Sequence, residues 1–164
     1  MNSQITFTDC TSWNNNKGWD QGTHNIYNMN AMYKHIRSLA YSNNHGINFV
    51  GPGTAGYSGT VTFYLIDSII RDNCVQGSNV YGSPRKLYFV HNVYDNNGAG
   101  TCGSTFNVGN IGLNPDGVTD GGHIEDYLYN NIFYKPATMS NLQQKFWSFT
   151  ATDYSLESDY NSWV

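Results

Sequence analysis

The chain has 164 residues, of which only 12% are charged, and its formal net charge is −4. This acidic balance and the lack of any Lys/Arg cluster exclude a protein that follows a nucleic-acid backbone. No stretch approaches the roughly 20 apolar residues of a membrane helix, so no membrane span is predicted. Turn-forming Asn (22 residues) and Gly (17), combined with strand-forming Tyr (13), Thr, Val and Ile, predict a single all-β domain over residues 1–164.

One segment recurs five times, at residues 5–16, 33–44, 61–73, 87–97 and 124–136. Each copy has a strand-like run, a small polar residue and a second short β-prone run, and four of the five then end in Asn. The first two copies continue into the pattern Asn-x-Gly-apolar-(Asp or Asn). Constant strand pieces at irregular spacing are typical of coils that stack in register and displace their insertions. We therefore expect a short, single-stranded, right-handed parallel β-helix of about five coils with long loops on one face.

In-register stacking also predicts columns of identical side chains about 4.8 Å apart. Asn15, Asn43, Asn73 and Asn97 form the expected asparagine ladder, and the aromatic positions of the repeats are expected to stack likewise. The remaining segments lack the repeat. Gly-rich residues 49–60 and 98–122 are predicted loops, residues 137–149 a short helix, and residues 158–163 a last strand-like edge.

The beginning of the chain and its cysteines bear on location. Met1 leads directly into a repeat, without the basic and apolar regions of a signal peptide, and we expect the chain to be a piece of a longer precursor. An extracellular or cell-surface location is expected for it. Cys10 is predicted to be a small core residue, whereas Cys74 and Cys102 lie in successive repeats and either pair or stay reduced.

These repeats, among them His91-Asn-Val-Tyr-Asp-Asn-Asn97, resemble the right-handed parallel β-helix proteins, a superfamily that includes polysaccharide lyases and phage depolymerases. A narrower resemblance joins the segment from Cys10 to Asn25 to calcium-dependent pectate lyases that use a lysine base. Lys17, Gly18, Trp19, Asp20 and Gln21 occupy the matching positions. The resemblance implies carbohydrate chemistry, with a polysaccharide as the partner.

Eliminative cleavage of a uronate polymer needs a base and a cation beside the substrate carboxylate. Lys17 is the candidate base, with a solvated turn lysine as the alternative. Calcium is the expected cation, with Asp20, Asp67 and Asp72 as its candidate ligands. The chain is then a lyase-like enzyme.

A hydrolase or a binding module would use other residues. Asp120 and His123, separated by two glycines at the end of the second predicted loop, form a further candidate catalytic pair. A binding module needs only side chains that contact sugar rings. The candidates for this role are Trp19, His45, Tyr57 and Tyr81.

Three functions therefore stay open. The first is a polysaccharide lyase, the second a polysaccharide-binding or adhesion module without catalysis, and the third a self-assembling solenoid. The third follows from unpaired strand edges at the two ends of an uncapped solenoid, which favour filament or trimer assembly.

Overall fold

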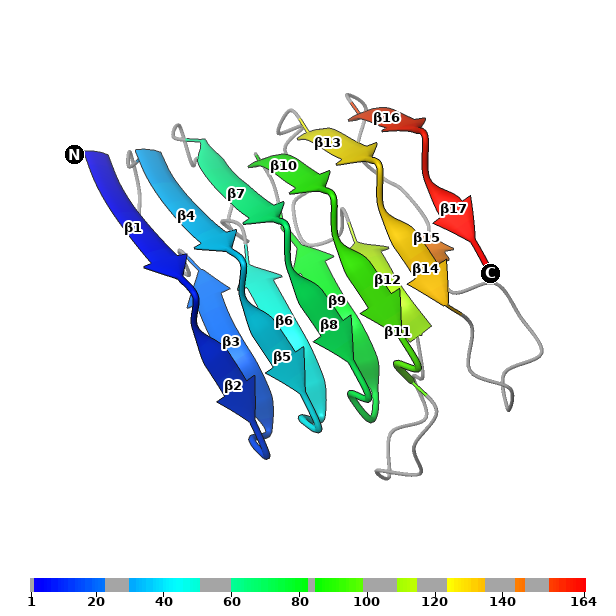
Figure 1. Cartoon of the computed structure of the whole chain (residues 1–164). Coiled ribbons are helices and arrows are strands. Elements are labelled where there is room, and N and C mark those ends of the chain that lie inside the picture. Colours follow the sequence, from blue (N-terminus) through cyan, green and yellow to red (C-terminus); the bar gives the residue numbers. More distant parts are fainter. Residues whose placement is uncertain are drawn as a thin grey trace.

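The described residues of this computed structural model are 2–22, 30–50, 60–82, 85–98, 109–114, 124–134, 144–146 and 154–164. Their regular structure consists of β-strands in three sheets, and every pair of neighbouring strands in these sheets is parallel (Figure 1). None of these residues belongs to a helix, so this part of the chain holds no helix that could cross a membrane.

The chain visits the three sheets in turn, one strand at a time. Sheet A has the order β1 (Asn2–Thr8), β4 (Asn30–Ile36), β7 (Val61–Ile66), β10 (Arg85–Val90), β13 (Ile124–Tyr129) and β16 (Tyr154–Asp159). Sheet B consists of β2 (Thr11–Trp13), β5 (Leu39–Tyr41), β8 (Ile69–Arg71), β11 (Val93–Asp95), β14 (Ile132–Tyr134) and β17 (Ser162–Trp163). Sheet C consists of β3 (Lys17–Gly22), β6 (His45–Val50), β9 (Gln76–Tyr81), β12 (Gly109–Asn114) and β15 (Gln144–Phe146). Hydrogen-bonded neighbours are thus three strands apart in sequence, which is the arrangement of a parallel β-solenoid.

Two residues make each passage from sheet A to sheet B. The first has a positive φ between 50° and 56°, a left-handed conformation that turns the chain through the corner. These first residues form an outer column, the corner column, of Asp9, Arg37, Asp67, His91, Asn130 and Tyr160. The second residue, such as Asn92 or Asn131, points inward, and the Asn92 side-chain amide donates to Asn131 Oδ1 at 3.0 Å.

The asparagine ladder predicted from the repeats is confirmed between sheets B and C. Asn43 donates from Nδ2 to Asn73 Oδ1 at 3.2 Å, and Asn73 in turn donates to Asn97 Oδ1 at 2.9 Å. Asn97 continues the ladder to Asn110 at 2.8 Å, and the backbone N–H of Asn15 donates to Asn43 Oδ1 at 3.0 Å. Asn43, Asn73, Asn97 and Asn110 are buried, so these hydrogen bonds satisfy polar groups that water does not reach.

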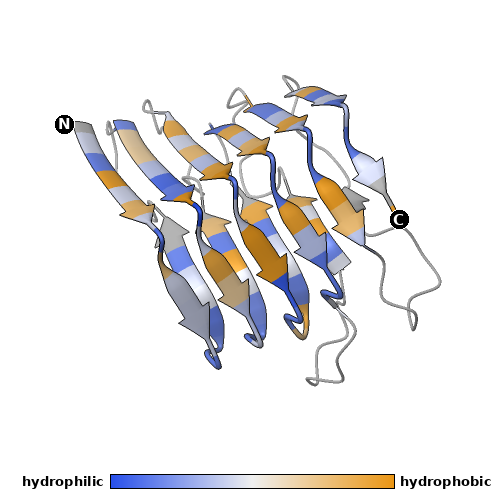
Figure 2. Cartoon of the chain, in the orientation of Figure 1, coloured by the Kyte–Doolittle hydropathy of each residue, from blue (hydrophilic) through white to orange (hydrophobic). Residues whose placement is uncertain are grey.

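The core lies between the three sheets. In β7, β10 and β13 every second residue is buried, and Figure 2 shows this alternation as bands of opposite hydropathy. Phe49, Phe63 and Phe89 are fully buried. The Phe49 ring centroid lies 4.5 Å from that of Phe63 and 6.0 Å from that of Phe89. Burial of one such ring stabilises the fold by about 1.5–3 kcal/mol.

A glycine column explains the Asn-x-Gly pattern of the repeats. A Cβ atom on Gly18 would lie 2.2 Å from the Gly46 carbonyl oxygen, and one on Gly46 would lie 2.5 Å from that of Gly77. Backbones of successive coils therefore approach too closely here for any side chain.

Several local expectations need correction or completion. The helix predicted over 137–149 is wrong at Gln144–Phe146, which form β15, and its other residues lie outside the described part. The loop predicted over 49–60 is wrong at residues 49 and 50, which are the last two of β6. The loop predicted over 98–122 is wrong at Gly109–Asn114, which form β12, because stacking on β9 gives this Gly-rich segment its strand partners. Cys74 is disulfide-bonded, whereas Cys102 lies outside the described residues. Cys10 is free and only half-buried, so its prediction as a core residue is wrong.

Candidate functional site

Three of the residues singled out by sequence lie together on sheet C. Lys17 on β3 is the register partner of His45 on β6, and Lys17 Nζ lies 2.9 Å from Asp20 Oδ2. The other oxygen of Asp20 accepts a hydrogen bond from Asn48 Nδ2 at 2.5 Å, and Asn48 Oδ1 accepts one from Asn79 at 2.8 Å. The result is a polar row across three strands that ends in the Lys17–Asp20 ion pair.

His45 is the neutral base of this group. Burial and, secondarily, the positive charge of Lys17 lower the pKa of its imidazole, while Asp20 opposes the shift. Its Nδ1 atom is buried and has no hydrogen-bond partner within the described residues. Lys17, by contrast, donates a charge-assisted hydrogen bond to Asp20. The arrangement therefore presents an ammonium group beside an uncharged imidazole.

Other predicted site residues lie elsewhere. Trp19 turns inward and packs on the core, with its ring 4.6 Å from that of His35. Tyr81 belongs to β9, but its side chain lies outside the described residues, as do Tyr57, Asp120 and His123 entirely.

The aspartates predicted as calcium ligands belong to different parts of the solenoid. Asp20 lies on sheet C, Asp67 on the corner column and Asp72 at the turn between β8 and β9. Asp67 Oδ1 is 3.4 Å from His91 Nδ1, and Asp72 accepts a hydrogen bond from Asn96 at 2.8 Å. Among the described residues, no three His, Cys, Asp or Glu side chains form a group that could hold a metal ion.

Sheet A presents a second, larger surface. Tyr64, Tyr88 and Tyr127 are register partners on β7, β10 and β13 and stack with ring centroids 4.8 Å apart and interplanar angles of 9° and 6°. Lys34 Nζ lies 5.0 Å from the centre of the Tyr64 ring and extends this tyrosine ladder onto β4. Because the rings cover one another's faces, the ladder presents mainly ring edges and hydroxyl groups outward.

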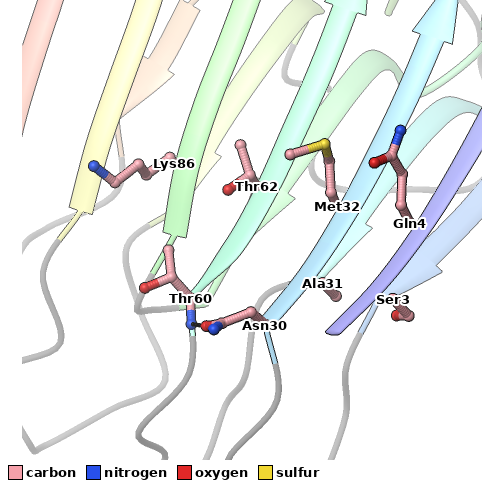
Figure 3. Close-up of a pocket in the computed structure, with 8 residues that line it drawn as sticks. All are labelled: Ser3, Gln4, Asn30, Ala31, Met32, Thr60, Thr62 and Lys86. Carbon is pink, nitrogen blue, oxygen red and sulfur yellow. Dashed lines mark hydrogen bonds between the residues drawn. The ribbon is translucent and has the colours of Figure 1, made fainter. Parts of the chain in front are cut away.

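A pocket of about 450 Å³ lies beside the ladder (Figure 3). Its wall includes four outward residues of adjacent strands: Gln4, Met32, Thr62 and Lys86. Below this row the Asn30 side chain accepts a hydrogen bond from the backbone N–H of Thr60 at 2.9 Å, and Ser3 and Ala31 complete the lining. Amide, hydroxyl and thioether groups thus line one cavity, and Lys86 at its edge extends toward Glu125 on β13.

Charge is distributed unevenly along this face. Lys34 and Lys86 lie on β4 and β10, whereas Glu125 and Glu157 lie on β13 and β16. Lys86 Nζ is 2.7 Å from Glu125 Oε2, and this hydrogen bond is the main reason that the pKa of Lys86 is raised. The pocket end of the face is therefore the cationic end.

This surface was not among the predicted sites, although the sequence holds a signal for it. Tyrosine recurs at the same place in three strands, in the runs Phe-Tyr-Leu, Leu-Tyr-Phe and Asp-Tyr-Leu around Tyr64, Tyr88 and Tyr127. Its alternation with buried neighbours places it on the outer face of the sheet. The pocket itself had no such signal, because its lining residues range from Ser3 to Lys86 and share no motif.

Comparison with known proteins finds no family model, no curated protein and no solved structure that matches this chain. Function therefore has to be inferred from its own two surfaces: the Lys17–Asp20–His45 group on sheet C, and the tyrosine ladder with its pocket on sheet A.

Proposed function

We propose that this protein is a right-handed β-solenoid of the polysaccharide-binding kind, which holds an acidic polysaccharide along the outer face of sheet A. The right hand is expected because crossovers between parallel strands of one sheet almost always take it. The observation that carries the proposal is the continuity of the pocket with the tyrosine ladder.

The size and lining of the pocket suit a sugar unit. A cavity of about 450 Å³ is within the range of small-molecule sites. Gln4, Asn30 and Thr62 offer hydrogen-bonding groups to hydroxyls, and Met32 offers an apolar contact to the C–H face of a ring. Such a mixture of polar groups and one adaptable apolar side chain is what a sugar requires.

Lysines favour an acidic sugar over a neutral one. Lys86 lines the pocket, and Lys34 lies one outward position along β4 from the pocket residue Met32. A uronate carboxylate in the pocket would receive charge-assisted hydrogen bonds, which are about twice as strong as neutral ones.

The tyrosine ladder could contact the sugar units that follow the one in the pocket. Six parallel strands spaced about 4.8 Å apart give a straight face roughly 24 Å long, long enough for several sugar units. Burial raises the pKa of Tyr64, so its hydroxyl stays protonated at neutral pH and can donate a hydrogen bond to a glycan oxygen. The sequence-based alternative of a binding module is thus retained, with different residues.

Isothermal titration of the full chain with oligogalacturonate, compared with a fully methyl-esterified oligomer of equal length, tests the proposal. We expect binding of the acidic oligomer, and at least a tenfold weaker affinity in Lys34→Gln/Lys86→Gln. Arg37→Gln removes a cation from the corner column instead and is the matched control, because it is expected to bind normally. Equal affinity for the two oligomers, or equal losses in both variants, would refute the proposal.

β-Elimination on the same class of polymer is the second candidate, and the proximity of Lys17 to His45 favours it. In this case the neutral imidazole of His45 would take the C5 proton, and the Lys17 ammonium would stabilise the charge that develops on the uronate carboxylate. The C4–O bond would then break as a C4–C5 double bond forms, and the leaving oxygen would take a proton from the imidazolium or from water. Incubation with polygalacturonate, with and without calcium, would show absorbance of unsaturated uronates. His45→Gln should abolish this signal while binding at sheet A persists; no absorbance from the unmodified chain under either condition would exclude elimination of this substrate.

A further inference from the structure

We propose that two copies of this chain associate through the outer faces of sheet B, around a twofold axis that runs parallel to the strands between β8 and β11. Neither the polysaccharide surface of sheet A nor the polar group on sheet C takes part in this contact.

Sheet B exposes apolar side chains in a regular row. The five three-residue strands β2, β5, β8, β11 and β14 each have a buried central residue, so their first and third residues point outward. The first-residue row contains Leu39, Ile69, Val93 and Ile132, which are register partners in that order, and Ile69 is 45% exposed. Figure 2 shows β8 and β14 as strongly hydrophobic strands. An apolar row of this kind on an outer face marks a contact surface.

The third-residue row contains the charges. Arg71 on β8 and Asp95 on β11 are register partners at its centre, with Tyr41 and Tyr134 on either side of them. The Arg71 guanidinium lies over the Tyr41 ring at 5.5 Å and reaches Asp72 at 3.3 Å. The carboxylate of Asp95 makes no hydrogen bond or ion pair with any residue in the described part of the chain. The Asp95 carboxylate is therefore half-buried and able to accept a cationic partner from a second molecule.

Both rows are complementary to themselves under the proposed axis. Reversing the strand order while keeping the strand direction brings Ile69 opposite Val93 of the second copy and Leu39 opposite its Ile132. In the other row the same operation brings Arg71 opposite the second copy's Asp95, twice per dimer. An isologous interface requires this self-complementarity.

The corner column obeys the same symmetry. Asp67 and His91 precede β8 and β11 directly, so the axis brings Asp67 opposite His91 of the second copy. A twofold axis along the solenoid instead would set Ile69 against Arg71, which would bury a charge on an apolar residue. Charge complementarity thus selects one orientation.

The size of the sheet B face determines how tightly the dimer is expected to associate. Its six strands span roughly 24 Å, and each is only about three residues wide. This is smaller than the about 800 Å² per partner of a stable complex, so the dimer is expected to be weak and to depend on concentration.

Sedimentation equilibrium of the full chain between about 10 µM and 1 mM tests the inference. We expect the mean mass to rise toward that of a dimer and no further. Arg71→Asp and Asp95→Arg, each of which sets like charges opposite one another, should weaken association at least tenfold. The double variant Arg71→Asp/Asp95→Arg should restore it, because the opposed pairs are again of opposite sign.

Folding is checked by far-ultraviolet circular dichroism, which should be unchanged because both side chains lie on the outer face. Ile69→Lys provides a second route to loss of association. A mass that stays monomeric up to about 1 mM, or a double variant that stays as weak as the single ones, would overturn the inference. A mean mass that rises beyond that of a dimer, and that Arg71→Asp does not lower, would also overturn the inference. Such a result would point to association through the open strand edges of β1 and β16 instead.

Discussion

Arg85 on β10 and Asp126 on β13 form a two-pronged ion pair inside the solenoid, where both side chains are fully buried. Arg85 Nε donates to Asp126 Oδ1 at 3.0 Å and Nη2 donates to Oδ2 at 2.6 Å. A third donor of Arg85, Nη1, reaches the carbonyl oxygen of Gly82 at 3.0 Å. The charges are thus compensated without water.

Removing one member of this pair should be strongly destabilising. Asp126→Asn leaves the Arg85 charge buried without its counter-ion, and we expect the free energy of unfolding to fall by about 3–5 kcal/mol. Urea denaturation measures this loss. Glu125→Gln is the control from the same strand, since its pair with Lys86 is partly exposed and should contribute only about 0–1 kcal/mol. Similar losses in the two variants would contradict a buried, unhydrated Arg85–Asp126 pair.

The asparagine ladder makes a second prediction. Asn73→Ala removes hydrogen bonds to Asn97 and to the Ala40 carbonyl, and it deprives Asn43 of its acceptor. Because these groups are buried, the expected loss of unfolding free energy is about 2–4 kcal/mol. Thermal or chemical denaturation can measure it. Asn16→Ala removes only an exposed hydrogen-bond acceptor of Asn44 and should lower the free energy of unfolding by less than about 1 kcal/mol. An equally small loss in Asn73→Ala would argue against a structural role of the ladder.

His35 predicts a pH dependence of stability. Burial lowers the pKa of its imidazole to about 4, and both ring nitrogens lack a hydrogen-bond partner among the described residues. The unfolded chain, with a His pKa of about 6.5, binds the proton more readily. Stability is therefore complete above about pH 6.5 and falls as the pH approaches 4, by up to about 3 kcal/mol.

Denaturation midpoints recorded from pH 7 to pH 4.5 measure this slope. His35→Leu should flatten most of it, whereas a smaller slope of the same sign should persist because the pKa of His45 is also lowered. An unchanged slope in His35→Leu would show that other groups produce it.

The glycine column makes a prediction about packing. Gly46→Ala would place a Cβ atom 2.5 Å from the Gly77 carbonyl oxygen and 2.9 Å from Ile70 Cγ2, so the coils must separate locally. We expect a loss of about 3 kcal/mol or more, measured by urea denaturation. Ser155→Ala, at an exposed position of β16, should change stability by no more than about 0.5 kcal/mol. A Gly46→Ala variant as stable as Ser155→Ala would mean that the coils are farther apart than described.

The repeats made the stacking register predictable from sequence. Lys17 and His45 occupy equivalent positions of two copies, and they are register partners in sheet C. The ladder through Asn43, Asn73 and Asn97 follows from the same alignment, because side chains at equal positions of successive coils must face one another.

Sheet C was harder to predict beyond its first two strands. Gln76–Tyr81 and Gly109–Asn114 are rich in Gly and polar residues and have little strand propensity of their own. They are extended because each stacks on the preceding coil. The pocket on sheet A was not predictable, because no motif in the sequence marks the residues that line it.

The connections between the sheets differ in how much their length varies from coil to coil. Two residues always lead from sheet A to sheet B, whereas the passage from sheet C back to sheet A takes three residues between β9 and β10 (82–84) and ten between β6 and β7 (51–60). The passage from sheet B to sheet C also varies, from three residues between β2 and β3 (14–16) to thirteen between β11 and β12 (96–108). Extra chain can therefore be accommodated at both of these junctions without disturbing the stacking register. Foreign peptides grafted there, one per coil, would be displayed side by side at intervals of about 4.8 Å.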